Sequence, residues 1–127
     1  KVRGNVSIVI RDVRPDDAAA VSGILNRIIE AGVYTVLDRP FSVDEERRFI
    51  EAFPRRGTFL VAESTEERAV VGFQNVEPLA AYTRAFDHVG VIGTFVDLDH
   101  RRLGVSGQLF LATFDAAEQK RFRKLFA

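Results

Sequence analysis

The stretch that decides the fold is VDLDHRRLGVSGQL, which spans residues 96–109. It has the pattern of a strand end, a tight basic loop and the start of a helix. The first amides of a helix have no intrahelical partner and lie at the positive end of its dipole, so several N–H groups converge on an anion. Gly104 and Gly107 allow close backbone approach because they lack a Cβ, and Arg101 and Arg102 add positive charge. We therefore expect this segment to bind a polyphosphate.

The spacing Arg101-x-x-Gly104-x-Ser106 resembles the Q/R-x-x-G-x-G/A signature of the GNAT superfamily of N-acetyltransferases. In that family the loop binds the pyrophosphate of acetyl-CoA. Two positions depart from the signature: Ser106 replaces the usual glycine or alanine, and Arg102 replaces the usual glycine after the first arginine. The alternative interpretation is a helix-start glycine next to solvated arginines.

The resemblance implies that acetyl-CoA is bound by the end of a strand and by the loop that follows it. The pantetheine arm is expected to lie like an extra strand along Thr94, Phe95 and Val96. A backbone N–H near Phe95 is expected to polarise the thioester carbonyl. The expected pyrophosphate site comprises Arg101, Arg102, Gly104, Val105, Ser106 and Gly107.

Length and composition predict one domain over residues 1–127 and exclude several kinds of partner. Eighteen basic residues balance 18 acidic ones, so no overall field draws the chain to nucleic acid or to an anionic membrane. Cysteine is absent, which excludes disulfides and thiolate zinc sites, and no metal is expected. No window approaches the roughly 18 uninterrupted apolar residues of a membrane span, so we expect a cytoplasmic protein.

The hydrophobic pattern predicts a strand at 6–10 and an amphipathic helix at 17–31. Ser42 and Glu45 form a capping box that starts a second helix, which Pro54 ends. The apolar side of this second helix is expected to comprise Val43, Phe49, Ile50 and Phe53. The remaining predicted elements are strands at 58–63, 69–77 and 88–96, a helix at 104–119 and a strand at 122–127.

This order of elements predicts an α/β or α+β sheet layered by helices. The GNAT resemblance implies a mixed, mostly antiparallel sheet with helices on both faces. Gly90 and Gly93 in the fourth strand permit a bulge or a close approach by another backbone. The chain stops in or just after its predicted fifth strand, so further residues are expected after Ala127.

The chain also resembles the phosphinothricin and amino-acid N-acetyltransferase branch of the family, over residues 24–35, 40–42 and 45–47. That resemblance implies a small-molecule amine as acetyl acceptor, and it favours a homodimer. The loop between the first two helices is then expected to form one wall of the acceptor pocket. Tyr34 and Phe41 are the expected wall residues, with core or surface packing as the alternative.

The general base of the expected reaction is not obvious from the sequence. The branch often carries a glutamate on the fourth strand, but this chain has Val91 there. Glu30 and His88 are the catalytic candidates. The alternative for Glu30 is an exposed carboxylate near a helix end, and the alternative for His88 is a strand-end histidine without a catalytic role. Asp87 fits a turn residue better than a base. The family's tyrosine, which protonates the leaving thiolate, normally lies beyond the position of Ala127. Tyr34 and Tyr82, the tyrosines of this chain, lie elsewhere.

The sequence thus supports an N-acetyltransferase that moves the acetyl group of acetyl-CoA directly to a small amine. A second interpretation is a protein of the same fold that holds coenzyme A without turnover. A third is an interaction domain whose basic loop binds another phosphate.

Overall fold

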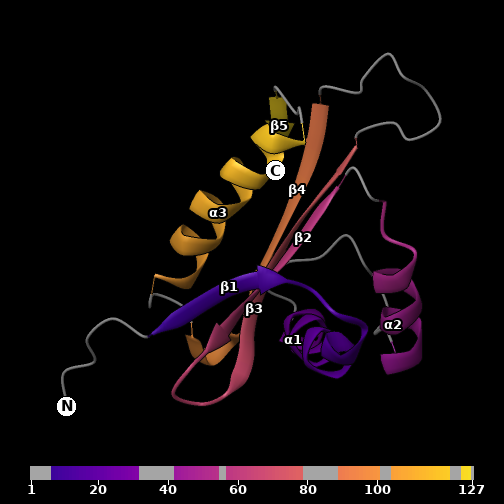
Figure 1. Cartoon of the computed structure of the whole chain (residues 1–127). Helices are drawn as coiled ribbons and strands as arrows, with labels where there is room; N and C mark the ends of the chain where they lie inside the picture. Colours follow the sequence, from indigo (N-terminus) through magenta and orange to yellow (C-terminus); the bar gives the residue numbers. More distant parts are fainter. Residues whose placement is uncertain are drawn as a thin grey trace.

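The computed structural model describes residues 7–31, 42–54, 57–78, 89–100, 104–120 and 124–126 (Figure 1). Its strands are β1 (Ile8–Asp12), β2 (Thr58–Ser64), β3 (Ala69–Pro78), β4 (Val89–Val96) and β5 (Lys124–Phe126). Its α-helices are α1 (Ala18–Ala31), α2 (Val43–Glu51) and α3 (Val105–Gln119). Short 3-10 helices, η1 (Pro15–Asp17) and η3 (Leu98–His100), precede α1 and follow β4.

The five strands form one sheet in the order β1-β2-β3-β4-β5. The pairs from β1 to β4 are antiparallel, whereas β5 runs parallel to β4. The predicted mixed, mostly antiparallel sheet is therefore confirmed. The pairing with β5 covers only the start of β4, from Val89 to Val91. From Ile92 to Val96, the outer edge of β4 has no strand partner within the described part of the chain.

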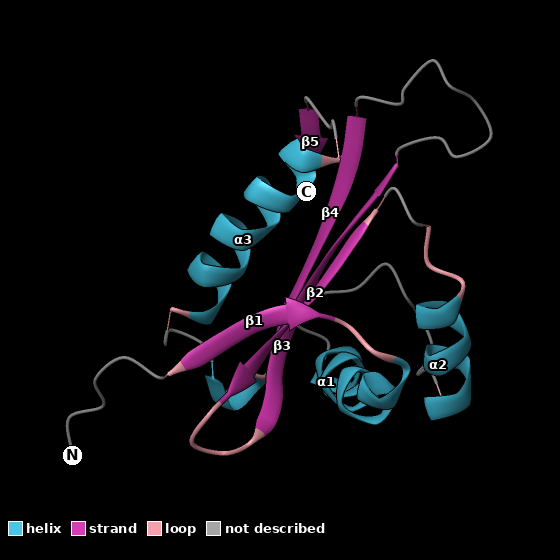
Figure 2. Ribbon diagram, viewed as in Figure 1, coloured by secondary structure: helices cyan, strands magenta, loops and turns pink. Residues whose placement is uncertain are grey.

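Helices cover both faces of the sheet, as expected (Figure 2). The helices α1 and α2 lie on one face and bury an apolar cluster against Phe59, Val61 and Phe73. Helix α3 lies on the other face and packs its buried Val105 and Leu109 against side chains of β2, β3 and β4. At roughly 1.5 to 3 kcal/mol for each fully buried large apolar side chain, these two layers hold the helices on the sheet.

The approach of α3 to the sheet depends on Gly72 in β3. A Cβ at this position would lie 3.1 Å from the carbonyl oxygen of Phe95 and 3.1 Å from Cγ1 of Val105. Val105 is the first residue of α3 and is 1% exposed. Because residue 72 has no side chain, the start of α3 lies directly against the β3–β4 pair.

Of the two features that Gly90 and Gly93 permit, a bulge is not seen in the pairing of β4 with β3. The β3–β4 register is continuous from Gly72 opposite Val96 to Pro78 opposite Gly90. The irregularity lies instead between β2 and β3, where Val71 is the extra residue of β3. Gly93 does permit a close approach, but by a side chain: a Cβ there would lie 3.1 Å from Oδ1 of Asn75.

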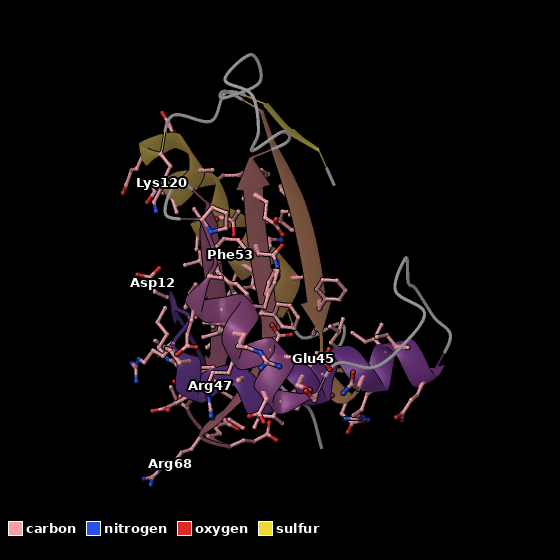
Figure 3. All side chains as sticks on the ribbon, turned by 90° about the vertical axis from the view of Figure 1, so that its right-hand side faces the viewer. Asp12, Glu45, Arg47, Phe53, Arg68 and Lys120 are labelled. Carbon is pink, nitrogen blue, oxygen red and sulfur yellow. The ribbon has the colours of Figure 1, made fainter. Side chains whose placement is uncertain are left out.

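A row of phenylalanine rings connects α2 to the sheet. The rings of Phe53 and Phe59 meet edge to face at 5.2 Å between centroids, and Phe59 and Phe73 are stacked at 5.7 Å. Phe73 in turn stacks on Phe95 at 5.0 Å, so the row ends at β4. Figure 3 shows Phe53 at the end of α2, where the row begins. These ring contacts connect α2 to β4 through the strands between them.

Helix α2 begins at the predicted capping box and packs through Ile50, Phe49 and Phe53 of the predicted apolar side, but it also buries a carboxyl that was not expected. The amide of Glu45 donates to Oγ of Ser42 at 3.1 Å, and the amide of Ser42 donates to the Glu45 carboxylate at 3.0 Å. Of the predicted apolar side, Ile50 is buried, whereas Val43 is 40% exposed. Glu46, one turn before Ile50, is only 2% exposed. Burial raises the pKa of Glu46 to about 7.

Glu46→Gln should stabilise the protein in a pH-dependent way. The folded-state pKa of about 7 lies above the unfolded value of 4.5, so the stability linked to the protonated carboxyl is complete below pH 4.5 and is lost as the pH rises through 7. At pH 8 we expect Glu46→Gln to raise the free energy of unfolding by about 1 to 3 kcal/mol in urea titrations. Glu51→Gln, an exposed change on the same helix, is the control. An equal effect of Glu46→Gln at pH 4 and pH 8 would contradict the buried-carboxyl account.

Candidate functional site

The N-terminus of α3 presents backbone donors that no side chain caps. Gly104 is the N-cap residue and has φ 80°, a left-handed conformation that favours glycine. The first intrahelical bond is donated by the amide of Gln108 to the carbonyl of Gly104 at 3.1 Å. The N–H groups of Val105, Ser106 and Gly107 therefore have no intrahelical acceptor, and the helix dipole adds positive potential at the same end.

These amides open into a pocket of about 480 Å³ next to the end of β4. A Cβ at Gly104 or Gly107 would meet no atom of the described residues within 4 Å, so the space in front of the backbone is open among them. The donors, the open space and the absence of a side-chain cap suit a bound anion. The residues that line the pocket are Thr94, Val96, His100, Gly104, Val105, Ser106 and Gly107. All of these except His100 are among the residues singled out from the sequence.

Phe95 lies outside this pocket. Its ring stacks on Phe73 on the α1–α2 face of the sheet, opposite the face covered by α3. The amide of Asp97 donates to the carbonyl of Val71 on β3 at 2.8 Å. In an antiparallel pair every second residue directs its backbone N–H toward the partner strand, so the N–H of Phe95, two residues earlier, also points toward β3. The backbone groups that face the open edge are those of Thr94 and Val96. The predicted oxyanion contact near Phe95 stays a prediction, and the N–H groups of Thr94 and Val96 are oriented for it whereas that of Phe95 is not.

Thr94 is held in place from inside the sheet. The side-chain amide of Gln74 donates to Oγ1 of Thr94 at 2.6 Å, and Gln74 is fully buried beneath α3. Because the Thr94 hydroxyl accepts this bond, its own proton remains available to donate toward the pocket. Replacing Gln74 would leave that hydroxyl without its fixed partner.

His100 ties the segment between β4 and α3 to two distant parts of the chain. Its Nδ1 lies 2.8 Å from Oδ2 of Asp97, and its Nε2 lies 2.5 Å from Oε2 of Glu67 in the β2–β3 turn. Asp97 also accepts a hydrogen bond from Nη1 of Arg27 on α1 at 2.6 Å. Burial of the ring lowers the pKa of His100, but the hydrogen bonds and charges of Glu67 and Asp97 outweigh it and raise the pKa above 6.5. We call these four residues the loop clamp.

The loop clamp was not predicted from the sequence. The three-residue spacing of Asp97 and His100 is a weak signal for a local contact. Glu67, in the β2–β3 turn, is 33 residues from His100, and Arg27, on α1, is 70 residues from Asp97. Local sequence patterns do not predict contacts between residues so far apart. Their effect is to fix the geometry of residues 97–100, which lead into the N-terminus of α3.

The loop clamp predicts a pH-dependent contribution to stability. Because the folded-state pKa of His100 is raised above its unfolded value of 6.5, the contribution is complete below pH 6.5 and is lost as the pH rises through the folded value. Urea titrations should show wild type more stable than His100→Gln at pH 6 by about 1 kcal/mol, a modest figure because Glu67 is half exposed and screened by water. The advantage should shrink toward pH 9. A constant difference across this range would mean that the imidazolium charge is irrelevant.

The remaining predicted site residues are separate from this pocket or are not described. Glu30 is exposed, next to the last residue of α1. The others lie outside the described residues; they are Arg101, Arg102, His88, Asp87, Tyr34, Tyr82 and Phe41.

The described ranges lack a membrane-spanning helix and a metal-binding cluster. None of the helices there is long and apolar enough to cross a bilayer. Those ranges also hold no group of three or more histidine, cysteine, aspartate or glutamate side chains arranged to bind a metal ion.

The combination of an open β4 edge and an uncapped, glycine-flanked α3 agrees with comparisons to known proteins. A family model described as "Acetyltransferase (GNAT) family" matches residues 26–127. The chain belongs to the GNAT family of acetyltransferases. None of the curated protein sequences matches it.

Solved structures share the fold at low sequence identity. An N-acetyltransferase from Staphylococcus aureus Mu50 superposes with a TM-score of 0.84 at 23% identity over 94% of this chain and 71% of its own length. The acetyltransferase yncA from Salmonella typhimurium, solved with its cofactor acetyl-CoA, gives 0.82 at 20% identity over 91% of this chain and 66% of its own. A phosphinothricin acetyltransferase from Sinorhizobium meliloti in complex with acetyl-CoA gives 0.80 at 18% identity over 88% and 60%. The chain thus spans about two thirds of the length of these relatives.

Proposed function

We propose that this GNAT chain binds acetyl-CoA between the open edge of β4 and the N-terminus of α3. The observation that carries the proposal is the pocket in which both features meet, lined by Thr94 and Val96 on one side and by Gly104–Gly107 on the other. The pyrophosphate accepts hydrogen bonds from the uncapped amides of Val105, Ser106 and Gly107. The pantetheine arm pairs with the outward backbone groups of Thr94 and Val96, as an added strand would.

We further propose direct acetyl transfer to an amine in a ternary complex. The amine nitrogen attacks the thioester carbon, and the carbonyl electrons move onto oxygen. A backbone N–H at the open edge stabilises that oxyanion, and collapse of the intermediate breaks the C–S bond. The protein contributes mainly by orientation, because two reactants held in the right geometry react in an effectively unimolecular step.

A small-molecule amine, such as an amino acid or an analogue, is the acceptor in this proposal. Support comes from the sequence resemblance to the amino-acid branch and from the phosphinothricin acetyltransferase among the structural neighbours. The overall charge of zero gives no reason to expect a strongly basic peptide as the acceptor.

Coenzyme A binding without turnover is the second candidate. It is favoured by one observation: the sequence of β4, VGVIGTFV, contains no ionisable side chain that would serve as a base beside the thioester. Thiol release from acetyl-CoA in the presence of mixed L-amino acids separates the two candidates. If the protein transfers the acetyl group, thiol release should depend on the amine. If it only binds coenzyme A, calorimetry should show binding but no thiol should be released. Failure of coenzyme A to bind at all would contradict both candidates.

Gly107→Leu should weaken coenzyme A binding without unfolding the protein. Leucine is a better helix former than glycine, and a Cβ at this position would have no described atom within 4 Å outside its own helix backbone. The new side chain would fill the pocket in front of the amides. Calorimetry should show a Kd for coenzyme A raised at least tenfold, or about 1.4 kcal/mol.

Gly23→Leu is the matched control for this substitution. Gly23 is also an exposed helical glycine with open space at its Cβ, but it lies on α1, away from the pocket. Its substitution should leave the Kd unchanged. Equal affinity of Gly107→Leu and wild type, with both folded, would rule out this pyrophosphate site.

A further inference from the structure

Direct transfer requires a proton acceptor close to the thioester, because an amine acceptor is protonated at neutral pH. Among the described residues, β4 pairs with β5 from Val89 to Val91, and its backbone groups at Ile92, Thr94 and Val96 face away from β3. An arm that runs from the α3 pocket along Val96 and Thr94 reaches Ile92 after about 13 Å of strand. In the proposed function, the reacting end of the arm therefore lies near Ile92.

Glu77 lies beside this point on the neighbouring strand. In the β3–β4 register, Glu77 is directly opposite Val91, and Asn75 is directly opposite Gly93. Side chains of a strand alternate between faces, so Glu77 and Asn75 share the face of Phe73, which packs in the α1–α2 layer. Oδ1 of Asn75 already overlies Gly93, where no side chain intervenes. A polar strip thus runs beside the point where the edge opens.

The carboxylate of Glu77 has no structural task among the described residues. It is half-buried, and no hydrogen bond or ion pair joins it to another described residue. By contrast, Glu63 pairs with Arg11, Glu67 with His100, and Asp97 with both Arg27 and His100.

The other carboxylates on this side are placed less well. Glu30 is exposed near the end of α1. Glu46 belongs to α2, which packs on α1 and η1 rather than on β4. Glu77 alone among these three sits on a strand directly paired with β4.

We propose that Glu77 is the catalytic base that takes the proton from the acceptor ammonium, directly or through one water. This inference rests on the proposed function. The carboxylate accepts one proton from the ammonium, and the freed lone pair forms the N–C bond while the carbonyl electrons move onto oxygen. Collapse breaks the C–S bond, the second amine proton leaves with the thiolate as free thiol, and Glu77 returns its proton to water.

The test compares thiol release by wild type and Glu77→Gln with acetyl-CoA and a mixture of free L-amino acids. We expect kcat to fall about 100-fold, while the Kd for coenzyme A and the thermal midpoint stay unchanged. The ratio of wild-type to variant rates should shrink as the pH approaches the pKa of the free amines, because the substrate then arrives deprotonated. A purely structural role of Glu77 would leave this ratio constant with pH.

A rescue variant tests the position of the carboxylate. Residue 91 lies directly opposite residue 77 in the β3–β4 register. Adding Val91→Glu to the Glu77→Gln variant therefore puts a carboxylate back at the same cross-strand pair, and it should restore at least a tenth of the wild-type kcat. Glu66→Gln, an exposed change in the β2–β3 turn, is the control and should have no effect. An active Glu77→Gln with a wild-type pH profile would overturn this inference alone. Absence of amine-dependent release by wild type would overturn both the inference and the proposed transfer.

Discussion

The close contact of α3 with the β3–β4 pair is the constraint on which the site depends. It exists because Gly72 leaves room for Val105 against the backbone of Phe95. That contact puts the first turn of α3 next to the last residues of β4, so helix-end amides and strand-edge amides open into one pocket. A Cβ at residue 72 would require the Phe95 carbonyl or the Val105 side chain to shift by a few tenths of an ångström. Packing on one face of the sheet therefore sets the binding geometry at its edge.

The two ends of β4 have different surroundings, which gives the open edge a direction. At its C-terminal end, the loop clamp fixes the path into α3 through Asp97 and His100. At its N-terminal end, β4 pairs with β5 from Val89 to Val91. The face that carries Phe95 and Asn75 is supported by the phenylalanine row and α1, whereas the opposite face is occupied by α3. In the proposed complex, acetyl-CoA is anchored at the C-terminal end of this edge and presents its acetyl group toward the other end.

Much of this architecture is predictable from local sequence signals. The start of α3 predicted from periodicity and caps differs from the observed start by one residue. The predicted first residue of β2 and last residue of β3 also agree with the observed ones to within one residue. The pocket residues from Gly104 to Gly107 were predictable because they form a contiguous helix start with a recognisable spacing. Features that depend on distant contacts were not: the bulge at Val71, the buried Glu46 and the contact of Glu67 with His100. The register that brings Glu77 opposite Val91 is likewise a property of the folded sheet.

The central claim is that strand-edge and helix-end amides bind one coenzyme A molecule together. Amide chemical-shift mapping by NMR during a titration with coenzyme A tests it most directly. The account predicts that the amides of Thr94, Val96, Val105, Ser106 and Gly107 shift along one binding curve, while those of α2 (Val43–Glu51) stay in place. Shifts confined to other parts of the chain, or separate curves for the strand and the helix, would contradict it.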